Sequence, residues 1–184
     1  MKEITLPLHS VTKVVGLEKV NSTLSVAQAL STGNEPVGTL VLTCEQTRTF
    51  ETPRGFVSSG EGGVYFTLLL PARGEAERTG QALSGAIRHT VEHALELKTK
   101  LVSGGVAAWD KTSRKWKQFA DVTCTVEGKY LFLSAGILLN NPVPRFLASS
   151  HVTLKHLLKS ETSKELFLDD VLTGFWKNYA FLNY

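Results

Sequence analysis

Several features that would narrow the function are scarce or missing in this sequence. Its 184 residues include only two cysteines, Cys44 and Cys124, which lie far apart and lack the paired spacing of zinc sites and redox pairs. We therefore expect buried thiols in a reducing compartment. No apolar run approaches the ~20 residues that a membrane span requires, and the N-terminus leads into no apolar signal core. The expected location is cytoplasmic, with no membrane partner.

Positive charge is present but not concentrated. The formal net charge is +3, and the sequence contains no run rich in Lys and Arg. Because nucleic-acid binding usually needs a clustered basic surface, we expect no nucleic-acid partner, although an anionic ligand such as a nucleotide is compatible with this charge. The length suits one domain over residues 1–184 with a sizeable core.

Apolar patterns predict both strands and helices. The continuous apolar runs 39–44 and 64–70 are typical of buried strands, and the alternating segment 119–126 followed by Glu127-Gly128-Lys129 predicts a hairpin. Apolar residues at helical spacing predict three further segments, which lie after Asn21-Ser22-Thr23, around 83–95 and around 168–179. Layered packing of helices on a sheet follows from this mixture.

The segment between the first two apolar runs is polar and shows no helical or strand period. Loops of this length in a compact domain usually serve a function, so we expect a ligand to bind here. Its two ends, Glu45-Gln46-Thr47 and Gly62-Gly63 followed by Val64-Tyr65-Phe66-Thr67-Leu68-Leu69-Leu70, resemble the catalytic domain of biotin protein ligases in the biotin/lipoate ligase superfamily. That family carries a glycine- and arginine-rich ATP- and biotin-binding loop between these ends, whereas this chain has the divergent segment 48–55.

Further matches extend the resemblance from about Val20 to about Tyr179. Ser22 and Thr23 match a family motif whose side chains approach the biotin ring, although a simple helix cap explains them equally well. The segment 134–144 resembles the family strand that ends in Asn-Asn, although a strand end with an Asn-Pro turn is the alternative. The resemblance implies these ligand-binding residues: Ser22, Thr23, Gln46, Arg48, Thr49, Arg54, Gly55, Gly62, Gly63, Gly136 and Asn140.

The activating lysine of the family has no counterpart, because Val106 occupies its place. Asp110 aligns with a family aspartate, and Lys111 and Lys115 are the candidate catalytic stand-ins for the lysine. Of Arg48 and Arg54, we expect Arg54 to be the better phosphate contact, because the adjacent Gly55 lets the backbone come close to an anion. The residues indicate no metal site.

The resemblance implies an α+β fold, with a mixed, mainly antiparallel sheet and helices on one side. It implies one catalytic domain with neither an N-terminal winged helix nor a C-terminal small β-domain. The implied activity is ATP-dependent biotinylation of a carrier-domain lysine of a carboxylase through biotinyl-AMP, with ATP, Mg²⁺ and biotin as cofactors. The alternatives are a binding module without catalysis and a relative that transfers lipoyl or another acyl group. Family members often form homodimers, and the sequence does not decide whether this chain does.

One further motif has a separate interpretation. His89-Thr90-Val91-Glu92-His93 has the spacing of some zinc peptidases, in which two histidines one helical turn apart ligate a metal. The two histidines and Glu92 lie opposite the apolar stripe of the expected helix. We therefore predict a solvated helix surface at this motif.

Overall fold

The computed structural model describes residues 11–52, 55–72 and 75–182. Within them lies a seven-stranded sheet in which β1 and β2 are parallel and the other neighbouring strands are antiparallel. This confirms the predicted mixed, mainly antiparallel sheet. In sheet order the strands are β1 (Lys13–Val20), β2 (Thr39–Gln46), β5 (Val64–Pro71), β9 (Tyr130–Ile137), β8 (Lys115–Glu127), β7 (Gly105–Asp110) and β6 (Thr99–Val102).

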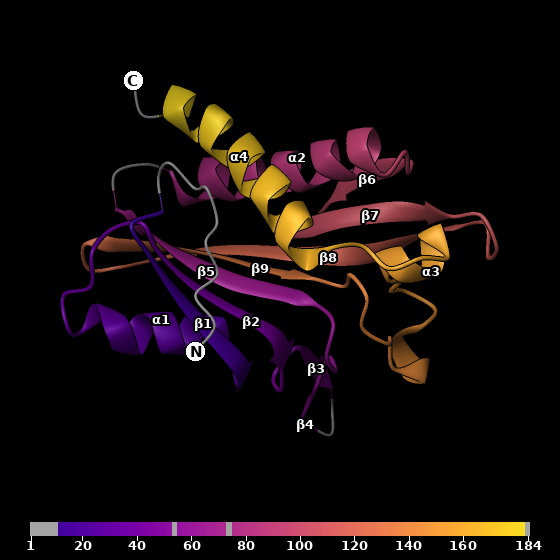
Figure 1. The fold of residues 1–184 in the computed structure, drawn as a ribbon, viewed down its shortest axis with the longest axis horizontal. Helices are drawn as coiled ribbons and strands as arrows, with labels where there is room; N and C mark the ends of the chain where they lie inside the picture. Colours follow the sequence, from indigo (N-terminus) through magenta and orange to yellow (C-terminus); the bar gives the residue numbers. More distant parts are fainter. Residues whose placement is uncertain (1–10, 53–54, 73–74, 183–184) are drawn as a thin grey trace.

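Helices cover both faces of the sheet. On one face, α2 (Ala76–Ala94) and α4 (Lys164–Leu182) pack on alternate residues of β5 and β9, whereas α1 (Thr23–Ser31) packs on the opposite face, as Figure 1 shows. The prediction of helices on one side is therefore wrong. An apolar stripe shows that a helix packs on a sheet, but it does not show on which face. The shorter helical turns are η1 (Arg145–Leu147) and α3 (Leu154–Leu158).

The polar segment between β2 and β5 contains a small hairpin that the sequence did not indicate. Strands β3 (Phe50–Thr52) and β4 (Gly55–Val57) pair in antiparallel fashion apart from the main sheet. Strands of three residues are too short to show an alternating pattern. The hairpin projects beyond the end of β2 in Figure 1.

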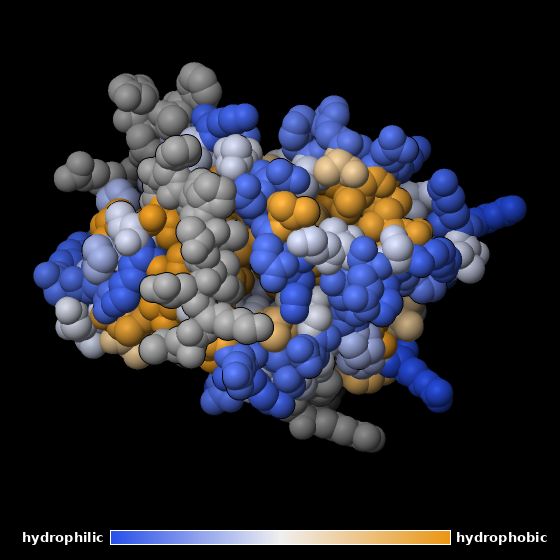
Figure 2. All heavy atoms as spheres, in the orientation of Figure 1, coloured by the Kyte–Doolittle hydropathy of each residue, from blue (hydrophilic) through white to orange (hydrophobic). Residues whose placement is uncertain are grey.

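The main core lies between the sheet and the helices α2 and α4. Leu68 and Leu133, on the neighbouring strands β5 and β9, are fully buried in it. The face of the molecule in Figure 2 shows hydrophobic residues in separate patches among hydrophilic ones. None of the described helices is long and apolar enough to cross a membrane. Cys44 and Cys124 are free, and both are partly buried rather than buried as expected.

Candidate functional site

A cavity of about 180 Å³ lies where the start of α1 meets the sheet. It is bounded by the end of β2, by β5 and by the middle of β8 and β9. Hydroxyl groups and one amide dominate its lining. The lining residues are Ser22, Thr23, Leu24, Gln46, Thr49, Tyr65, Asp121, Thr123, Ser134, Ala135, Gly136 and Leu138.

A chain of polar side chains crosses the cavity face of the sheet. Thr67 Oγ1 donates to Thr23 Oγ1 at 3.0 Å and lies 2.8 Å from Ser134 Oγ. Thr23 in turn donates from its backbone N–H to Gln46 Oε1 at 3.0 Å. Because Thr23 and Thr67 are buried, these bonds satisfy groups that would otherwise be costly to remove from water. The network fixes the start of α1 relative to three strands.

The same contacts set the orientation of the Gln46 amide. A backbone N–H can only donate, so the Gln46 atom that faces Thr23 must be the carbonyl oxygen. The Nε2 group then lies on the other side of the amide, and no hydrogen bond from it is found among the described residues. Within the described residues, both N–H groups of Gln46 are therefore left to donate to the carbonyl of a ligand. Ser22 caps α1, as predicted: its Oγ accepts a hydrogen bond from the backbone N–H of Ser25.

The ring of Tyr65 forms the floor of the cavity and is 1% exposed. A Cβ atom at Gly63 would lie 2.3 Å from this ring, and one at Gly136 would lie 3.2 Å from it. Both glycines therefore make room for the ring. Burial raises the pKa of the Tyr65 phenol, an effect that hydrogen bonds with Ser59 and Asn141 partly oppose. The phenol stays neutral at physiological pH.

Asp121 and Thr123 are the exposed members of the lining and mark its open side. Gln118 Nε2 donates to Asp121 Oδ1, and no hydrogen bond to Oδ2 is found within the described ranges. Removal of water by the surrounding protein raises the pKa of Asp121, and the charge of His151 opposes this rise. Burial lowers the pKa of His151, and the negative charge of Asp121 opposes this decrease. Burial thus disfavours the charged form of both side chains, and their mutual attraction opposes this effect.

The three candidate catalytic residues lie at the turn between β7 and β8. Lys111 and Lys115 are exposed there, and neither lines the cavity. Lys115 is six residues from Asp121 along β8, about 20 Å at ~3.3 Å per residue. The structure therefore does not bring these two lysines to the cavity, and their catalytic role stays a prediction without geometric support.

Asp110 stabilises this turn. Its carboxylate is buried, contacts Lys117 Nζ at 3.1 Å, and accepts from Ser113 Oγ and the Thr112 backbone N–H. Burial alone raises the pKa of Asp110, but the hydrogen bonds from Ser113, Lys117 and Thr112 outweigh this effect and hold it well below its ordinary value. All of these partners belong to the turn and its flanking strand.

Two more of the expected ligand-binding residues hold backbone segments in place. Asn140 donates from Nδ2 to Thr162 O at 2.8 Å and accepts from Thr162 N at 3.0 Å, which fixes the chain before α4. Gly62 has a φ of +107°, and a Cβ there would lie 3.0 Å from Asn141 N. Neither residue lines the cavity.

The loop residues after Gln46 are placed only in part. Thr49 lines the cavity and donates to Gln46 O at 2.6 Å. Arg48 is exposed, and its backbone N–H donates to Asn21 O. Arg54 lies outside the described residues, and Gly55 is described only as the first residue of β4. The expected phosphate contact of Arg54 stays a prediction.

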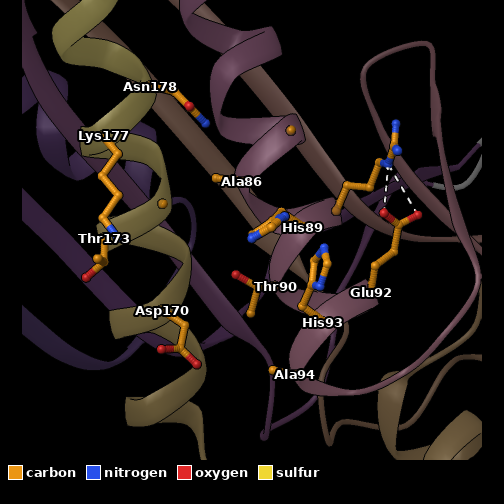
Figure 3. A pocket seen from close by; sticks show the side chains of 13 residues that line it. Ala86, His89, Thr90, Glu92, His93, Ala94, Asp170, Thr173, Lys177 and Asn178 are labelled. Atoms are coloured by element: carbon orange, nitrogen blue, oxygen red, sulfur yellow. Dashed lines mark hydrogen bonds and ion pairs between the residues drawn. The ribbon is translucent and has the colours of Figure 1, made fainter.

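The histidine motif of α2 lies in a separate groove between α2 and α4 (Figure 3). His89 and His93 are exposed, with ring centroids 4.1 Å apart, and Glu92 forms an ion pair with Arg88. No group of three or more potential metal ligands is found in the described part of the chain. The surface location of the two histidines is confirmed.

Seven residues that line the cavity were not among the candidates from the sequence. They are Leu24, Tyr65, Asp121, Thr123, Ser134, Ala135 and Leu138. A signal was available for Asp121 and Thr123. They alternate with Val122 and Cys124 along a strand, so they face away from the apolar core. What the pattern does not show is that α1 lies on that second face and closes a cavity over it.

Solved structures of similar fold are known. A biotin protein ligase from Aquifex aeolicus in complex with biotin and ATP has a TM-score of 0.74 and 21% identity, with 92% of this chain and 71% of that chain covered. A biotin protein ligase from Leishmania major with biotinyl-5-AMP has a TM-score of 0.62, 16% identity and coverage of 91% and 73%. A bi-partite lipoate protein ligase from Thermoplasma acidophilum has a TM-score of 0.62, 9% identity and coverage of 94% and 85%.

No protein-family model and no curated protein sequence matches the chain. At these identities the structural likeness concerns the fold. The chain has the α+β fold of the biotin/lipoate ligase catalytic domain, as the sequence motifs implied.

Proposed function

We propose that this chain binds the ring of biotin, or of a similarly small acyl ligand, in the cavity at the start of α1, and that it acts as a binding module. The observation that carries the proposal is the hydroxyl- and amide-lined cavity, in which Thr23 orients Gln46 so that two N–H donors remain. A fold shared with biotin ligases supports the ligand class but does not supply the activity.

The size and chemistry of the cavity suit a ring with carbonyl and N–H groups. Its volume of about 180 Å³ is below the ~300–1,000 Å³ of ordinary ligand pockets, so it would hold a ring while an attached acyl tail extends past its open side. Gln46 would donate to a ring carbonyl, and the hydroxyls of Thr23 and Ser134 can accept or donate. Tyr65 would pack against the ring from below.

The chemistry of acyl-adenylate formation fits this lining less well. Attack of a carboxylate on the α-phosphate of ATP develops charge that positively charged side chains must stabilise, and loss of one such donor costs about 10²–10³-fold in rate. Among the described residues, no Lys or Arg lines the cavity, and its charged member is Asp121. Bound ATP would supply the leaving group and Mg²⁺ would neutralise part of its charge. The described lining offers the phosphates no cationic side chain.

A working biotin or lipoate ligase is the second candidate. The observation in its favour is that Thr49, in the loop 47–49, lines the cavity. Arg48 is the adjacent residue of this loop and would be its cation for a phosphate. Such an enzyme would act on a carrier domain. Carrier binding, a homodimer and a cytoplasmic location remain predictions, and the two free thiols suit a reducing compartment.

Isothermal titration with biotin, followed by titration with ATP and Mg²⁺, tests the proposal. We expect micromolar to millimolar binding of biotin, and no biotinyl-adenylate by mass spectrometry when all ligands are mixed. Gln46→Leu should weaken biotin binding about tenfold, the value of one lost hydrogen bond. Gln28→Leu on α1 is the matched control, because Gln28 donates to Glu127 and does not line the cavity.

Three results separate the candidates. Biotin binding that falls in Gln46→Leu but not in Gln28→Leu supports the binding module. Adenylate formation would overturn it in favour of the ligase. Absence of biotin binding at millimolar concentration, with lipoic acid equally inactive, would contradict both.

A further inference from the structure

The open side of the cavity carries a negative charge. Asp121 is the one formally charged residue among the described residues that line it, and the other polar members are hydroxyls and the Gln46 amide. Asp121 and Thr123 are exposed, whereas Thr23 and Tyr65 at the closed end are buried. A ligand whose ring fills the closed end therefore extends its tail past the Asp121 carboxylate.

The Asp121 carboxylate has spare capacity to accept hydrogen bonds. Gln118 occupies Oδ1, and no donor to Oδ2 is found within the described ranges. An ionised carboxylate offers about four acceptor sites and no donor. The nearby His151 ring, whose pKa burial lowers, supplies little positive charge at neutral pH.

We propose that the cavity selects the amide form of its acyl ligand over the free carboxylic acid. This inference rests on the proposed function and names its substrate class. The tail of a free acid would bring a second carboxylate against Asp121, and like charges at a few ångströms repel strongly in a partly desolvated site. An amide removes that charge and presents an N–H that Asp121 Oδ2 accepts.

The chemical consequence concerns when the ligand arrives. An acyl group joined to nitrogen is the product of acyl transfer to an amine, such as the side chain of a lysine on a protein. The chain therefore recognises the acyl group after its transfer, and a separate acyl-transfer reaction must supply this ligand.

Titration with three probes that share one ring tests the inference. These are biotin, biotin methyl ester and biotinamide. For the unaltered protein we expect biotinamide to bind at least tenfold more tightly than biotin, with the ester between them, because the ester lacks both the charge and the N–H. Asp121→Asn should shrink the amide-to-acid ratio at least tenfold, since an Asn amide can donate to the free acid. Asp121 is exposed and the change is isosteric, so the variant keeps the fold.

Asp170→Asn is the matched control. Asp170 is an exposed carboxylate of α4 in the groove of Figure 3, on the other side of the sheet, and the substitution changes the net charge equally. The ratio should stay as in the unaltered protein.

The possible results are distinct. If biotin binds as tightly as biotinamide or more tightly, the inference is overturned while the proposed function stands. An amide preference that survives in Asp121→Asn also overturns it, because the selectivity then has another source. If none of the three probes binds at millimolar concentration, the proposed function fails and the inference fails with it.

Discussion

The two faces of the sheet use the same strands for different purposes. On the face toward α2 and α4, neighbouring positions of β5 and β9 such as Leu68 and Leu133 are apolar and fully buried. On the face toward α1, the adjacent pair is Thr67 and Ser134, whose hydroxyls lie 2.8 Å apart. At these positions a shift of one residue along either strand separates the main hydrophobic core from the polar cavity, because successive side chains point to opposite faces. Further along the α1 face, Leu69 and Phe132 belong to a smaller apolar cluster.

This contrast indicates how the domain combines stability with binding. The face toward α2 and α4 buries the larger apolar surface, which holds the strands in place. The cavity face can then carry hydroxyls and a charge, which contribute less to stability than the apolar core does. Substitutions on the two faces should therefore separate unfolding from ligand binding.

The largest effect on stability is expected on the face toward α2 and α4. Leu133→Ala removes a fully buried side chain and leaves a void between the sheet and the helices. The free energy of unfolding should fall by about 2–5 kcal/mol. Urea denaturation followed by circular dichroism measures this loss. A loss below ~1 kcal/mol would mean that the two faces do not differ as described.

Asp110 is the buried charged residue of the β7–β8 turn, and its effect should depend on pH. Asp110→Asn should lower the free energy of unfolding by about 1.5–3 kcal/mol at pH 7, because Lys117 loses its charged partner. The folded-state pKa of Asp110 lies below the unfolded-state value of about 3.9. Its contribution is therefore complete above that value, and it disappears as the pH falls below it.

Denaturation of both proteins at a series of pH values checks this dependence. The difference between the unaltered protein and Asp110→Asn should be constant from pH 7 to about pH 5 and should shrink below about pH 4. Asp170→Asn, an exposed carboxylate, is the control and should show little difference at any pH. A difference that grows in acid would contradict the assignment.

Thr67→Val should have a smaller effect on stability and a clear effect on binding. The change preserves the shape of the side chain but removes the hydroxyl that joins Thr23 to Ser134. We expect a loss of about 1–3 kcal/mol in unfolding free energy and weaker binding of biotin or biotinamide. Ser84→Ala, a buried hydroxyl on α2, serves as the control for binding. Unchanged affinity in Thr67→Val would exclude the network from ligand binding.

The smallest effect is expected at the histidine motif. Replacement of His89 and His93 by Gln should change the unfolding free energy by less than ~0.5 kcal/mol, because both are exposed. Addition of Zn²⁺ should not raise the melting temperature of either protein. A zinc-dependent increase that is lost in the double variant would restore the metal-site hypothesis.

The strands and the family fold could be predicted from the sequence for different reasons. The runs at Thr39–Cys44 and Val64–Leu70 are apolar enough to identify strands by themselves, and the motif around Gln46 gave the fold. The hairpin of β3 and β4 escaped prediction because its strands are too short to show a period. The face covered by α1 escaped because it depends on chain direction and packing between distant segments.

The cavity was predicted in part. Ser22, Thr23, Gln46, Thr49 and Gly136 line it, as the resemblance implied, while Asn140 and Gly62 hold backbone segments instead. The lining residues and the two backbone-holding residues all lie in motifs that match the family. The sequence alone does not show whether such a residue contacts a ligand or the backbone. The lysines were proposed from chemical type, and only the strand register shows that they lie at the far end of β8.

The ring of Tyr65 between Gly63 and Gly136 has a consequence for how related sequences can diverge. A side chain at Gly63 would collide with the ring, and one at Gly136 would press against it and require the ring to shift slightly, so both positions are constrained while the tyrosine is present. A smaller residue at 65 would release both at once and open the cavity floor. Related chains should therefore either keep all three residues or lose them together, and this covariation would reveal which of them share the same cavity depth.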